Sequence, residues 1–308
     1  MTKPFGPPER IGIIGLGKMG APMARNLQRA GFRVALNDID ANLANVLARE
    51  IDGKAYTSLP EMAQDCRVVI TMVPDGRIVR EVALGRAGAP EAGLAAGFAN
   101  GSVLIDMSSS APTGTQQLGR ELAERGIAMI DAPVSGGVRR AIPAQLAIMI
   151  GGDPELIERC RTVLSALGSQ LFVAGPLGAG HAIKCLNNYV SAAGLLAAAE
   201  GLVAAQRFGL EPKVALEVLN ASTGKNNSTE NKFAQFVFSR SFGSGFSLGL
   251  MAKDLRTALD LAAEVGAPMP LGEHCVPYWN DAEAALGTNS DHTEIVRMLE
   301  KITGRELN

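Results

Sequence analysis

Residues 11–20 read Ile11-Gly12-Ile13-Ile14 and then Gly15-Leu16-Gly17-Lys18-Met19-Gly20, and this stretch decides the fold. The short apolar run is typical of a buried strand, and the apolar spacing after it is typical of a helix. In such a strand, turn and helix, Gly15 permits the tight turn, Gly17 lets a pyrophosphate approach the backbone, and Gly20 lets the helix pack closely. The helix N-terminus then faces the anion. We therefore predict that a dinucleotide binds at Gly15, Leu16, Gly17, Lys18, Met19 and Gly20.

A second strand is predicted from Phe32 to Leu36, and Asn37 and Asp38 follow it directly. An acidic side chain at this spacing receives the ribose hydroxyls of the adenosine half of the cofactor. Because a carboxylate repels a 2′-phosphate, Asp38 favours NAD over NADP, although Arg33 nearby leaves NADP open. Asn37 and Asp38 are therefore assigned to the cofactor site.

Strand and helix signals go on alternating as far as Val173, which predicts a mostly parallel sheet. Strands are expected near Tyr56 and at Val68 to Met72, Val103 to Ile105, Ala128 to Ile130, Leu146 to Ile150 and Leu171 to Val173. Helices are expected at Ala41 to Ala48, after the capping box Ser58 to Glu61, at Thr113 to Arg125 and at Pro154 to Leu167. Loops leave the strands at Val73 to Asp75, Ser108 to Pro112 and Pro133 to Gly137. Ligands of an open α/β sheet lie beyond the carboxyl ends of its strands, so these loops should surround the nicotinamide.

From Gly178 onward the strand signals stop. A long helix is expected from Gly180 to Arg207, and shorter ones at Lys213 to Leu219, Ser228 to Phe238, Leu248 to Val265, Met269 to Ala285 and His292 to Ile302. The predicted fold class is therefore α/β: a Rossmann-type dinucleotide-binding domain over residues 9–176 and a second, all-α domain over residues 177–308, joined by the long helix.

Lys184 and Asn188 stand four residues apart on the long helix, which places them one turn apart on one face. Between Lys184 and Arg207 the one charged residue is Glu200, so Lys184 enters a helix built for burial. Burial lowers the pKa of a lysine toward the range where it can exchange protons. Lys184 is thus a candidate general acid/base. The alternative is a lysine that caps the solvent end of a core helix.

Composition narrows the classes of function. The chain has 308 residues, with 29 Lys and Arg against 31 Asp and Glu and no basic block, which argues against nucleic-acid binding. Its cysteines are scattered and form no C-x-x-C pair, which predicts reduced thiols in a cytoplasmic protein and no metal site. The apolar run from Tyr189 to Gln206 contains Glu200, so we interpret it as a core helix and predict no membrane span.

Four separated stretches resemble the β-hydroxyacid dehydrogenases: Gly15 to Leu27, Asp131 to Gly137, Gly178 to Asn188, and Lys253-Asp254-Leu255. The resemblance extends from about residue 10 to 300. That family includes 3-hydroxyisobutyrate dehydrogenase and tartronate semialdehyde reductase. It implies oxidation of a small hydroxy acid, or reduction of its semialdehyde, with NAD or NADP, and a helical domain that helps to form homodimers or homotetramers.

The resemblance also implies roles for single residues. Lys184 matches the catalytic lysine of the family and Asn188 its helper, which also holds the substrate. Ser135, Gly136 and Gly137 match the segment that binds the substrate carboxylate, where backbone N–H groups beside a hydroxyl make an anion nest. The remaining matches are Val73 and Pro74 at the cofactor ribose, Ser109 near the nicotinamide, Lys253 at the cofactor, and Phe246, which either lines the substrate pocket or belongs to the core.

The chain departs from the family in two segments. Arg139, Arg140 and Ala144 stand where relatives usually carry small residues and glycine, and 225–227 (Lys-Asn-Asn) stands in the segment that sets specificity in 3-hydroxyisobutyrate enzymes. The added charge suits either a doubly anionic substrate or a solvated surface, and the surface is favoured. Three other functions stay open: an imine reductase of the same fold, a 6-phosphogluconate-type decarboxylase, and a non-catalytic NAD-binding sensor. Lys184 argues against the first and the last.

Overall fold

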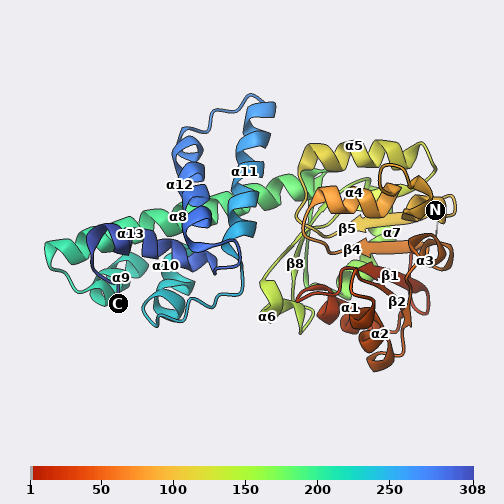
Figure 1. Cartoon of the computed structure of the whole chain (residues 1–308), viewed down its shortest axis with the longest axis horizontal. Helices are drawn as coiled ribbons and strands as arrows, with labels where there is room; N and C mark the ends of the chain where they lie inside the picture. Colours follow the sequence, from red (N-terminus) through yellow and green to blue (C-terminus); the bar gives the residue numbers. More distant parts are fainter. Residues whose placement is uncertain (1–2) are drawn as a thin grey trace. The chain divides into compact units, whose positions relative to one another are not determined.

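The computed structural model describes residues 3–308 (Figure 1). It divides the chain into two compact units, one that ends at Lys184 and one that runs over Cys185–Asn308. Helix α8, Ala179–Phe208, spans this division. The predicted domains, 9–176 and 177–308, were divided where the strand signals stop. These domain limits stay a prediction.

The first unit is built on one sheet whose strands have the order β3-β2-β1-β4-β5-β6-β8-β7, with β9 paired to β8. From β3 to β6 all neighbours are parallel, which is the doubly wound arrangement. β8 is antiparallel to β6 and β7 and parallel to β9. The Rossmann-type prediction is therefore confirmed. The strands are β1 Arg10–Ile14, β2 Arg33–Asn37, β3 Lys54–Ala55, β4 Val68–Thr71, β5 Val103–Asp106, β6 Ala128–Asp131, β7 Val134–Ser135, β8 Ala147–Gly151 and β9 Gln170–Gly175.

Alternate residues of the central strands serve two separate apolar cores, one on each face of the sheet. On β4, for example, Val68 and Ile70 belong to one core and Val69 to the other. Helices α1, α2 and α7 cover the first face, and α3, α4 and α5 cover the second. The helices and 3-10 turns of this unit are α1 Gly20–Arg29, α2 Ala41–Glu50, α3 Leu59–Asp65, α4 Gly76–Leu84, η1 Pro90–Ala92, η2 Leu94–Ala96, α5 Pro112–Ala123, α6 Gly137–Ala141 and α7 Pro154–Ser165.

Side-chain caps explain where several of these helices begin. The carboxylates of Asp40, Asp75 and Asp153 accept hydrogen bonds from the first-turn N–H groups of α2, α4 and α7. Ser58 caps α3 as predicted, accepting from Glu61 N at 3.4 Å. Two expectations were incomplete, because α4 was not foreseen and the segment 133–137 is not a plain loop. It contains β7 and the first residue of α6.

The second unit has no strand among its described residues, so the all-helical prediction is confirmed. Its core is formed by α8 residues such as Leu195 and Leu202 with Phe233, Leu255 and Trp279. Its elements are the rest of α8 with α9 Pro212–Ala221, α10 Asn227–Asn231, the π-helix η3 Phe233–Val237, α11 Leu248–Glu264, α12 Pro270–Leu286, the 3-10 turn η4 His292–Ile295 and α13 Val296–Thr303.

One predicted helix of this unit, Ser228 to Phe238, is wrong. The chain leaves α-helical geometry at Lys232, whose φ of −123° and ψ of −45° separate α10 from the π-helix η3. Asn226 begins α10 as its cap, and the Lys232 side chain turns onto Ser191 of α8. The apolar pattern continues through the break, which is why the pattern alone indicates a single helix.

Helix α8 is the only helix among residues 3–308 that is long and apolar enough to cross a membrane. The core helix of a soluble protein passes the same test, and 39% of its apolar window is buried inside the structure. Ala192, Leu195, Ala199 and Leu202 lie fully within the core of the second unit. The interpretation of 189–206 as a core helix is confirmed at these positions.

Candidate functional site

The three positions of the turn between β1 and α1 are occupied by glycine for different physical reasons. Gly15 has a φ of +90°, and a Cβ there would lie 2.3 Å from the Met72 carbonyl oxygen. A Cβ on Gly20 would lie 1.8 Å from the Gly15 carbonyl oxygen. Packing therefore requires both residues, whereas a Cβ on the exposed Gly17 would meet nothing within 4 Å. The open space at Gly17, beside a helix whose first turn has no side-chain cap, fits the approach of a phosphate.

The end of β2 is tied to this turn. Asp38 accepts a hydrogen bond from Leu16 N at 2.6 Å with one carboxylate oxygen and from Asp40 N at 2.9 Å with the other. Asn37 O accepts from Gly15 N at 3.0 Å. Each carboxylate oxygen of Asp38 keeps a lone pair, so the group can brace the turn and still accept a ribose hydroxyl.

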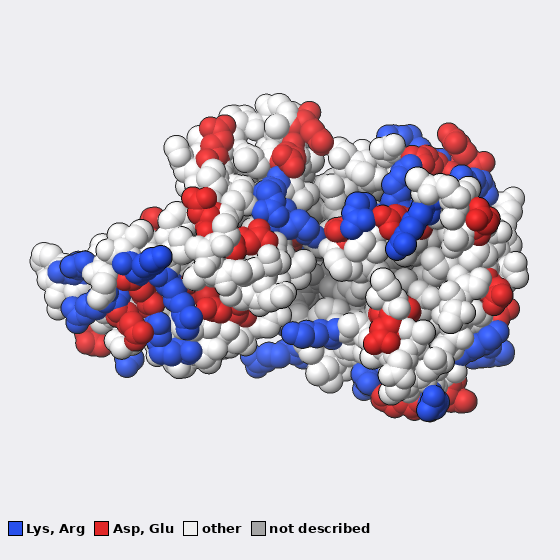
Figure 2. All heavy atoms as spheres, viewed as in Figure 1, with Lys and Arg blue, Asp and Glu red and all other residues white. Residues whose placement is uncertain are grey.

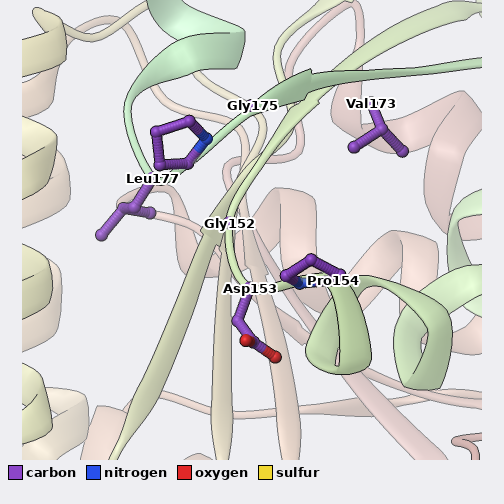
Figure 3. A pocket seen from close by; sticks show the side chains of 7 residues that line it. Gly152, Asp153, Pro154, Val173, Gly175 and Leu177 are labelled. Carbon is purple, nitrogen blue, oxygen red and sulfur yellow. The ribbon is translucent and has the colours of Figure 1, made fainter.

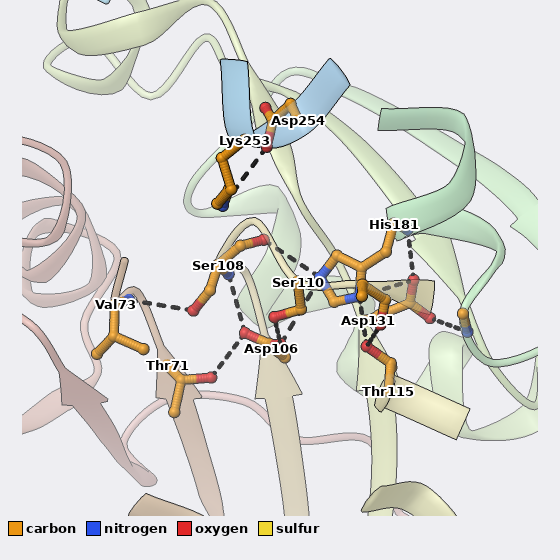
Figure 4. A network of polar contacts seen from close by, with 12 residues as sticks. Thr71, Val73, Asp106, Ser108, Ser110, Thr115, Asp131, His181, Lys253 and Asp254 are labelled. Carbon is orange, nitrogen blue, oxygen red and sulfur yellow. Dashed lines mark hydrogen bonds and ion pairs between the residues drawn. The ribbon is translucent and has the colours of Figure 1, made fainter. Parts of the chain in front are cut away.

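A buried carboxylate joins the loops after β4 and β5 (Figure 4). Asp106, at the end of β5, accepts from Thr71 Oγ1 at 2.9 Å, from Ser108 N at 2.9 Å and from Ser110 Oγ at 2.7 Å. Ser108 Oγ in turn accepts from Val73 N at 3.0 Å. The two loops that carry the predicted cofactor residues 73, 74 and 109 are thereby held next to each other.

His181 fastens the start of α8 to the same network. Asp131, at the end of β6, accepts from Gly178 N and from His181 N, both at 2.7 Å. The His181 imidazole is buried, with Nε2 donating to Ser108 O at 3.2 Å and Nδ1 lying 2.9 Å from Thr115 Oγ1. A carbonyl oxygen can only accept, so the Nε2 atom carries a proton.

Asp106 and Asp131 also flank the His181 ring, at 3.7 Å from Nε2 and 3.6 Å from Nδ1. None of His181, Asp106 and Thr115 stands out in the sequence, and the motif that contains Asp131 assigns it no role. One signal in the sequence could have indicated this network, because each of two otherwise apolar strands ends in an aspartate. The carboxyl ends of neighbouring parallel strands meet at one edge of the sheet, so these two carboxylates should lie close together.

Lys184 follows His181 by one turn of α8, and Asn188 follows Lys184 by another. Lys184 is half-buried and Asn188 is buried. Asn188 Nδ2 donates to Asp254 Oδ2 of α11 at 2.6 Å, and Lys253 Nζ lies 3.4 Å from the other oxygen of Asp254. The carboxylate of Asp254 thus fixes the direction of the Asn188 amide, a role that sequence reasoning did not assign to it.

The segment Ser135 to Gly137 forms the turn from β7 into α6. Gly136 and Gly137 have φ values of +122° and +61°, which residues with a side chain rarely adopt. Both glycines are exposed, and Ser135 is half-buried. The turn presents a hydroxyl beside two glycines of positive φ, the backbone shape of an anion nest, and the Arg140 side chain lies close to Gly136.

Two family models match almost the whole chain. Residues 10–175 match the NAD-binding domain of 6-phosphogluconate dehydrogenase, and residues 178–299 match the NAD-binding model of NADP-dependent 3-hydroxyisobutyrate dehydrogenase. The chain belongs to the β-hydroxyacid dehydrogenase family. It is therefore an NAD(P)-binding dehydrogenase or reductase, as the resemblance implied.

Relatives support the assignment of this family member over most of its length. It is 34% identical to 2-(hydroxymethyl)glutarate dehydrogenase of Eubacterium barkeri, with 96% of each chain covered. It is 36% identical to the NAD-dependent L-serine dehydrogenase of Pseudomonas aeruginosa over 86% of this chain and 89% of that one. The solved structure of Mycobacterium tuberculosis 3-hydroxyisobutyrate dehydrogenase with L-serine matches with a TM-score of 0.85 and 33% identity, covering 94% and 99% of the two chains.

Phe246 of this β-hydroxyacid dehydrogenase is half-buried and packs against the core of the second unit. Its ring meets that of His292 edge-on, with centroids 5.8 Å apart, and its carbonyl oxygen accepts from His292 N at 2.9 Å. The core contact is therefore observed, and a place in the substrate pocket stays a prediction.

The two departures from the family pattern lie at the surface. Arg139 and Arg140 are exposed on α6, and Lys225 is exposed and pairs with Glu230 at 2.8 Å. Figure 2 shows acidic and basic side chains interspersed over the face in view. Among residues 3–308 no group of three or more His, Cys, Asp or Glu side chains is placed to hold a metal ion.

A shallow hollow of about 460 Å³ in the first unit does not contain any of the predicted site residues (Figure 3). The carboxylate in its lining, that of Asp153, is committed to the N-cap of α7, where it accepts from Leu156 N at 2.9 Å. The hollow offers no general base or nucleophile. It is lined by Gly152, Asp153, Pro154, Val173, Gly175, Pro176 and Leu177.

Proposed function

We propose that this protein transfers a hydride between NAD(P) and the alcohol carbon of a small hydroxy acid, with Lys184 as the general acid/base. The observation that carries the proposal is the placement of Lys184 and Asn188 one turn apart on α8, with the Asn188 amide oriented by the buried Asp254. The relatives are named for 2-(hydroxymethyl)glutarate, L-serine and 3-hydroxyisobutyrate, and each of these is a small hydroxy acid. These names support a substrate of the 3-hydroxyisobutyrate or tartronate semialdehyde type.

The proposed roles follow from what the reaction requires. The bound nicotinamide supplies or accepts the hydride. When the carbinol carbon loses a hydride its hydroxyl must lose a proton, and the Lys184 amine accepts it, returning it in the reductive direction. Asn188 donates a hydrogen bond to the same oxygen. Ser135 and the backbone N–H groups of Gly136 and Gly137 hold the substrate carboxylate, with Phe246 against its carbon chain.

Four positions complete the proposed cofactor site beyond the glycine turn and the end of β2. They are Val73, Pro74, Ser109 and Lys253. Asp38 supports NAD as the preferred cofactor, because its carboxylate would face the 2′-phosphate of NADP. Comparing kcat/KM for NAD and NADP in the wild type and in Asp38→Ser tests the preference. We expect NAD to be favoured in the wild type and less so in the variant, and an NADP preference of the wild type would overturn the assignment.

The function itself is tested by following NADH absorbance with a panel of small 2- and 3-hydroxy acids and their semialdehydes. We expect Lys184→Ala to bind NADH as the wild type does and to lose at least about two orders of magnitude in turnover, the usual contribution of a general acid/base. Near-normal turnover by this variant would exclude the role of Lys184. Imine reduction without hydroxy acid oxidation, or NADH binding without any turnover by the wild type, would replace the proposed function.

We also propose a cytoplasmic location and a homodimer or homotetramer. The four cysteines are free and buried, and burial raises the pKa of the Cys66, Cys160 and Cys185 thiols to about 12, which keeps them protonated and unreactive. Phe208, Leu210, Val214 and Val218 are exposed, which supports burial of this segment in an oligomer. Light scattering of the purified protein would decide the oligomeric state, and localisation of a tagged chain would decide the compartment.

A further inference from the structure

Lys232, at the break between α10 and η3, is a lysine buried in the second unit, with 9% of its surface exposed. Its ammonium donates to Ser191 Oγ of α8 at 3.0 Å. Lysines are almost never buried unless they are paired. The buried Lys232 ammonium is therefore expected to have a partner that compensates for its lost hydration.

The chain holds Lys232 in this place through α10. Asn226 caps α10 by accepting from Ser228 N and Thr229 N, and its amide donates to Gly194 O of α8 at 3.2 Å. Ser228 Oγ donates to Ser191 O at 3.4 Å. The π-helix follows directly after Lys232, and single π-turns occur frequently at functional sites.

Among the described residues no carboxylate forms an ion pair with this ammonium. Within residues 3–308 the Lys232 side chain makes its hydrogen bond to Ser191 and no ion pair, although an ammonium has three N–H donors. The acidic group that acts on it is Asp291, but the carboxylate oxygens of Asp291 already accept from Ser244 Oγ at 2.9 and 2.8 Å and from Gly245 N at 2.9 Å. Asp291 also accepts from both the N–H and the hydroxyl of Thr293.

A second buried base, His292, lies close enough to Lys232 to feel its charge. His292 is buried, and among the described residues its Nε2 has no hydrogen-bond partner. Burial, and next the charge of Lys232, lower the pKa of His292 to about 4. Burial likewise lowers the pKa of Lys232 to about 8. Both groups would gain from an anion, which favours the charged form of a base.

The position of Ser191 relates this region to the proposed reaction. Lys184, Asn188 and Ser191 have the spacing i, i+4 and i+7, which puts them on one face of α8. At 1.5 Å of rise per residue Ser191 lies roughly 10 Å beyond Lys184 along the axis, with Asn188 between them. A molecule whose hydroxyl lies at Lys184 and Asn188 can therefore reach Ser191 and Lys232 with its far end if its carbon chain is a few atoms long.

We propose that Lys232 and Ser191 bind a second anionic group of the substrate, so that this enzyme acts on doubly anionic hydroxy acids or their semialdehydes. The inference rests on the proposed function and narrows its substrates to hydroxy acids of the same type that carry a second anionic group. The Lys232 ammonium and the Ser191 hydroxyl bind the anionic group that lies far from the reacting carbon. A charge-assisted hydrogen bond in a desolvated place is strong, and a neutral end group there would leave the ammonium unpaired.

The test compares 2-(hydroxymethyl)glutarate with its distal mono-amide, which has the same shape without the second charge. The variants are Lys232→Met, Ser191→Ala and, as a matched control, Lys301→Met, which replaces an exposed lysine of α13 in the same unit. We expect wild type and Lys301→Met to prefer the diacid by about 100-fold in kcat/KM, the scale of an interaction with a buried charge. Lys232→Met should lose most of that preference through KM for the diacid, with the mono-amide little changed. Equal loss on both substrates, or no preference in the wild type, would overturn the proposal.

A binding experiment separates this inference from the proposed reaction. Glutarate, which has no hydroxyl to oxidise, should raise the melting temperature of wild type and Lys301→Met but not that of Lys232→Met. If the wild type oxidises no hydroxy acid, the proposed function fails and this difference alone decides the anion site. Equal shifts in all three proteins, or no shift in any, would reject the site. Replacing glutarate by a sulfonate or phosphate monoester of similar length shows which anion it prefers.

Discussion

Substituting alanine at Gly17 and at Gly20 separates the glycine that the cofactor requires from the glycine that the fold requires. A Cβ at residue 20 would lie 1.8 Å from the Gly15 carbonyl oxygen, while a Cβ at residue 17 would meet nothing within 4 Å. Gly17 has no positive φ, so an alanine there carries no backbone strain. The two substitutions add the same methyl group three residues apart in one turn.

The close contact at residue 20 determines how much stability Gly20→Ala should lose. Carbon and oxygen that are not bonded pack at more than 3 Å, so α1 or the turn must shift by over an ångström, and overpacking of this kind costs about 1–3 kcal/mol or more. For a chain of this size each kcal/mol lowers the melting temperature by about 2–4 °C, so Gly20→Ala should melt roughly 3–10 °C lower. Gly17→Ala should stay within about 0.5 kcal/mol of the wild type, as exposed positions do.

Thermal melting with and without NADH, and NADH titration by fluorescence, measure both effects. Gly17→Ala should melt like the wild type without cofactor and bind NADH at least about tenfold more weakly, because 1.4 kcal/mol of lost phosphate contact is a factor of ten. If Gly17→Ala bound NADH normally, the phosphates would not approach this turn. If Gly20→Ala melted like the wild type, the packing argument for the third glycine would be refuted.

For three further substitutions the structure predicts whether stability rises or falls. Ala144 has a φ of +56°, so Ala144→Gly should raise stability by about 0.5–1 kcal/mol in chemical denaturation; a loss would contradict the strain. His181→Leu removes the bonds to Ser108 and Thr115 and should cost about 1–3 kcal/mol for each buried group left unpaired, with a loss of kcat beyond the loss of folded protein. The pKa of Lys232 is lowered from 10.5 to about 8, so its charge costs stability at pH 7 and less as the pH rises from 8 to 10.5. Lys232→Met should therefore gain up to about 3 kcal/mol at pH 7 and about 1 kcal/mol at pH 10, and equal gains would exclude the lowered pKa.

The sheet could be predicted from the sequence because each strand carries its own signal. β1, β4 and β5 are short apolar runs whose two faces are both buried, and β1 leads directly into the glycine turn. β7 and α6 could not be found in this way. They are two and five residues long, and β7 exists through its pairing with β8, which lies further along the chain.

The polar network at the strand ends could not be predicted for a different reason. Asp106, Asp131 and His181 are far apart in the chain, and they meet because β5 and β6 are neighbours and α8 begins beside them. A motif records which residues are adjacent in the sequence, whereas this network depends on the order of strands in the sheet. Lys232 shows the same limit, since the helical pattern of 228–238 has no sign of the break that turns its side chain onto α8.

Helix α8 explains why so few motifs predict so much of the candidate site. His181, Lys184, Asn188 and Ser191 follow one another at spacings of three, four and three residues, which forms one polar stripe on a helix that is otherwise mostly apolar. Each polar group on such a helix loses its hydration, so it persists only with a partner. Three of the four have buried partners: His181 contacts Ser108 and Thr115, Asn188 contacts Asp254, and Ser191 contacts Lys232. Because one helix sets the spacing of all four, the distance from the proposed proton acceptor to the proposed anion site is fixed before substrate binds. A rigid spacing of this kind selects substrates by length as well as by charge. Diacids one methylene shorter or longer should then lose turnover even though both charges are kept.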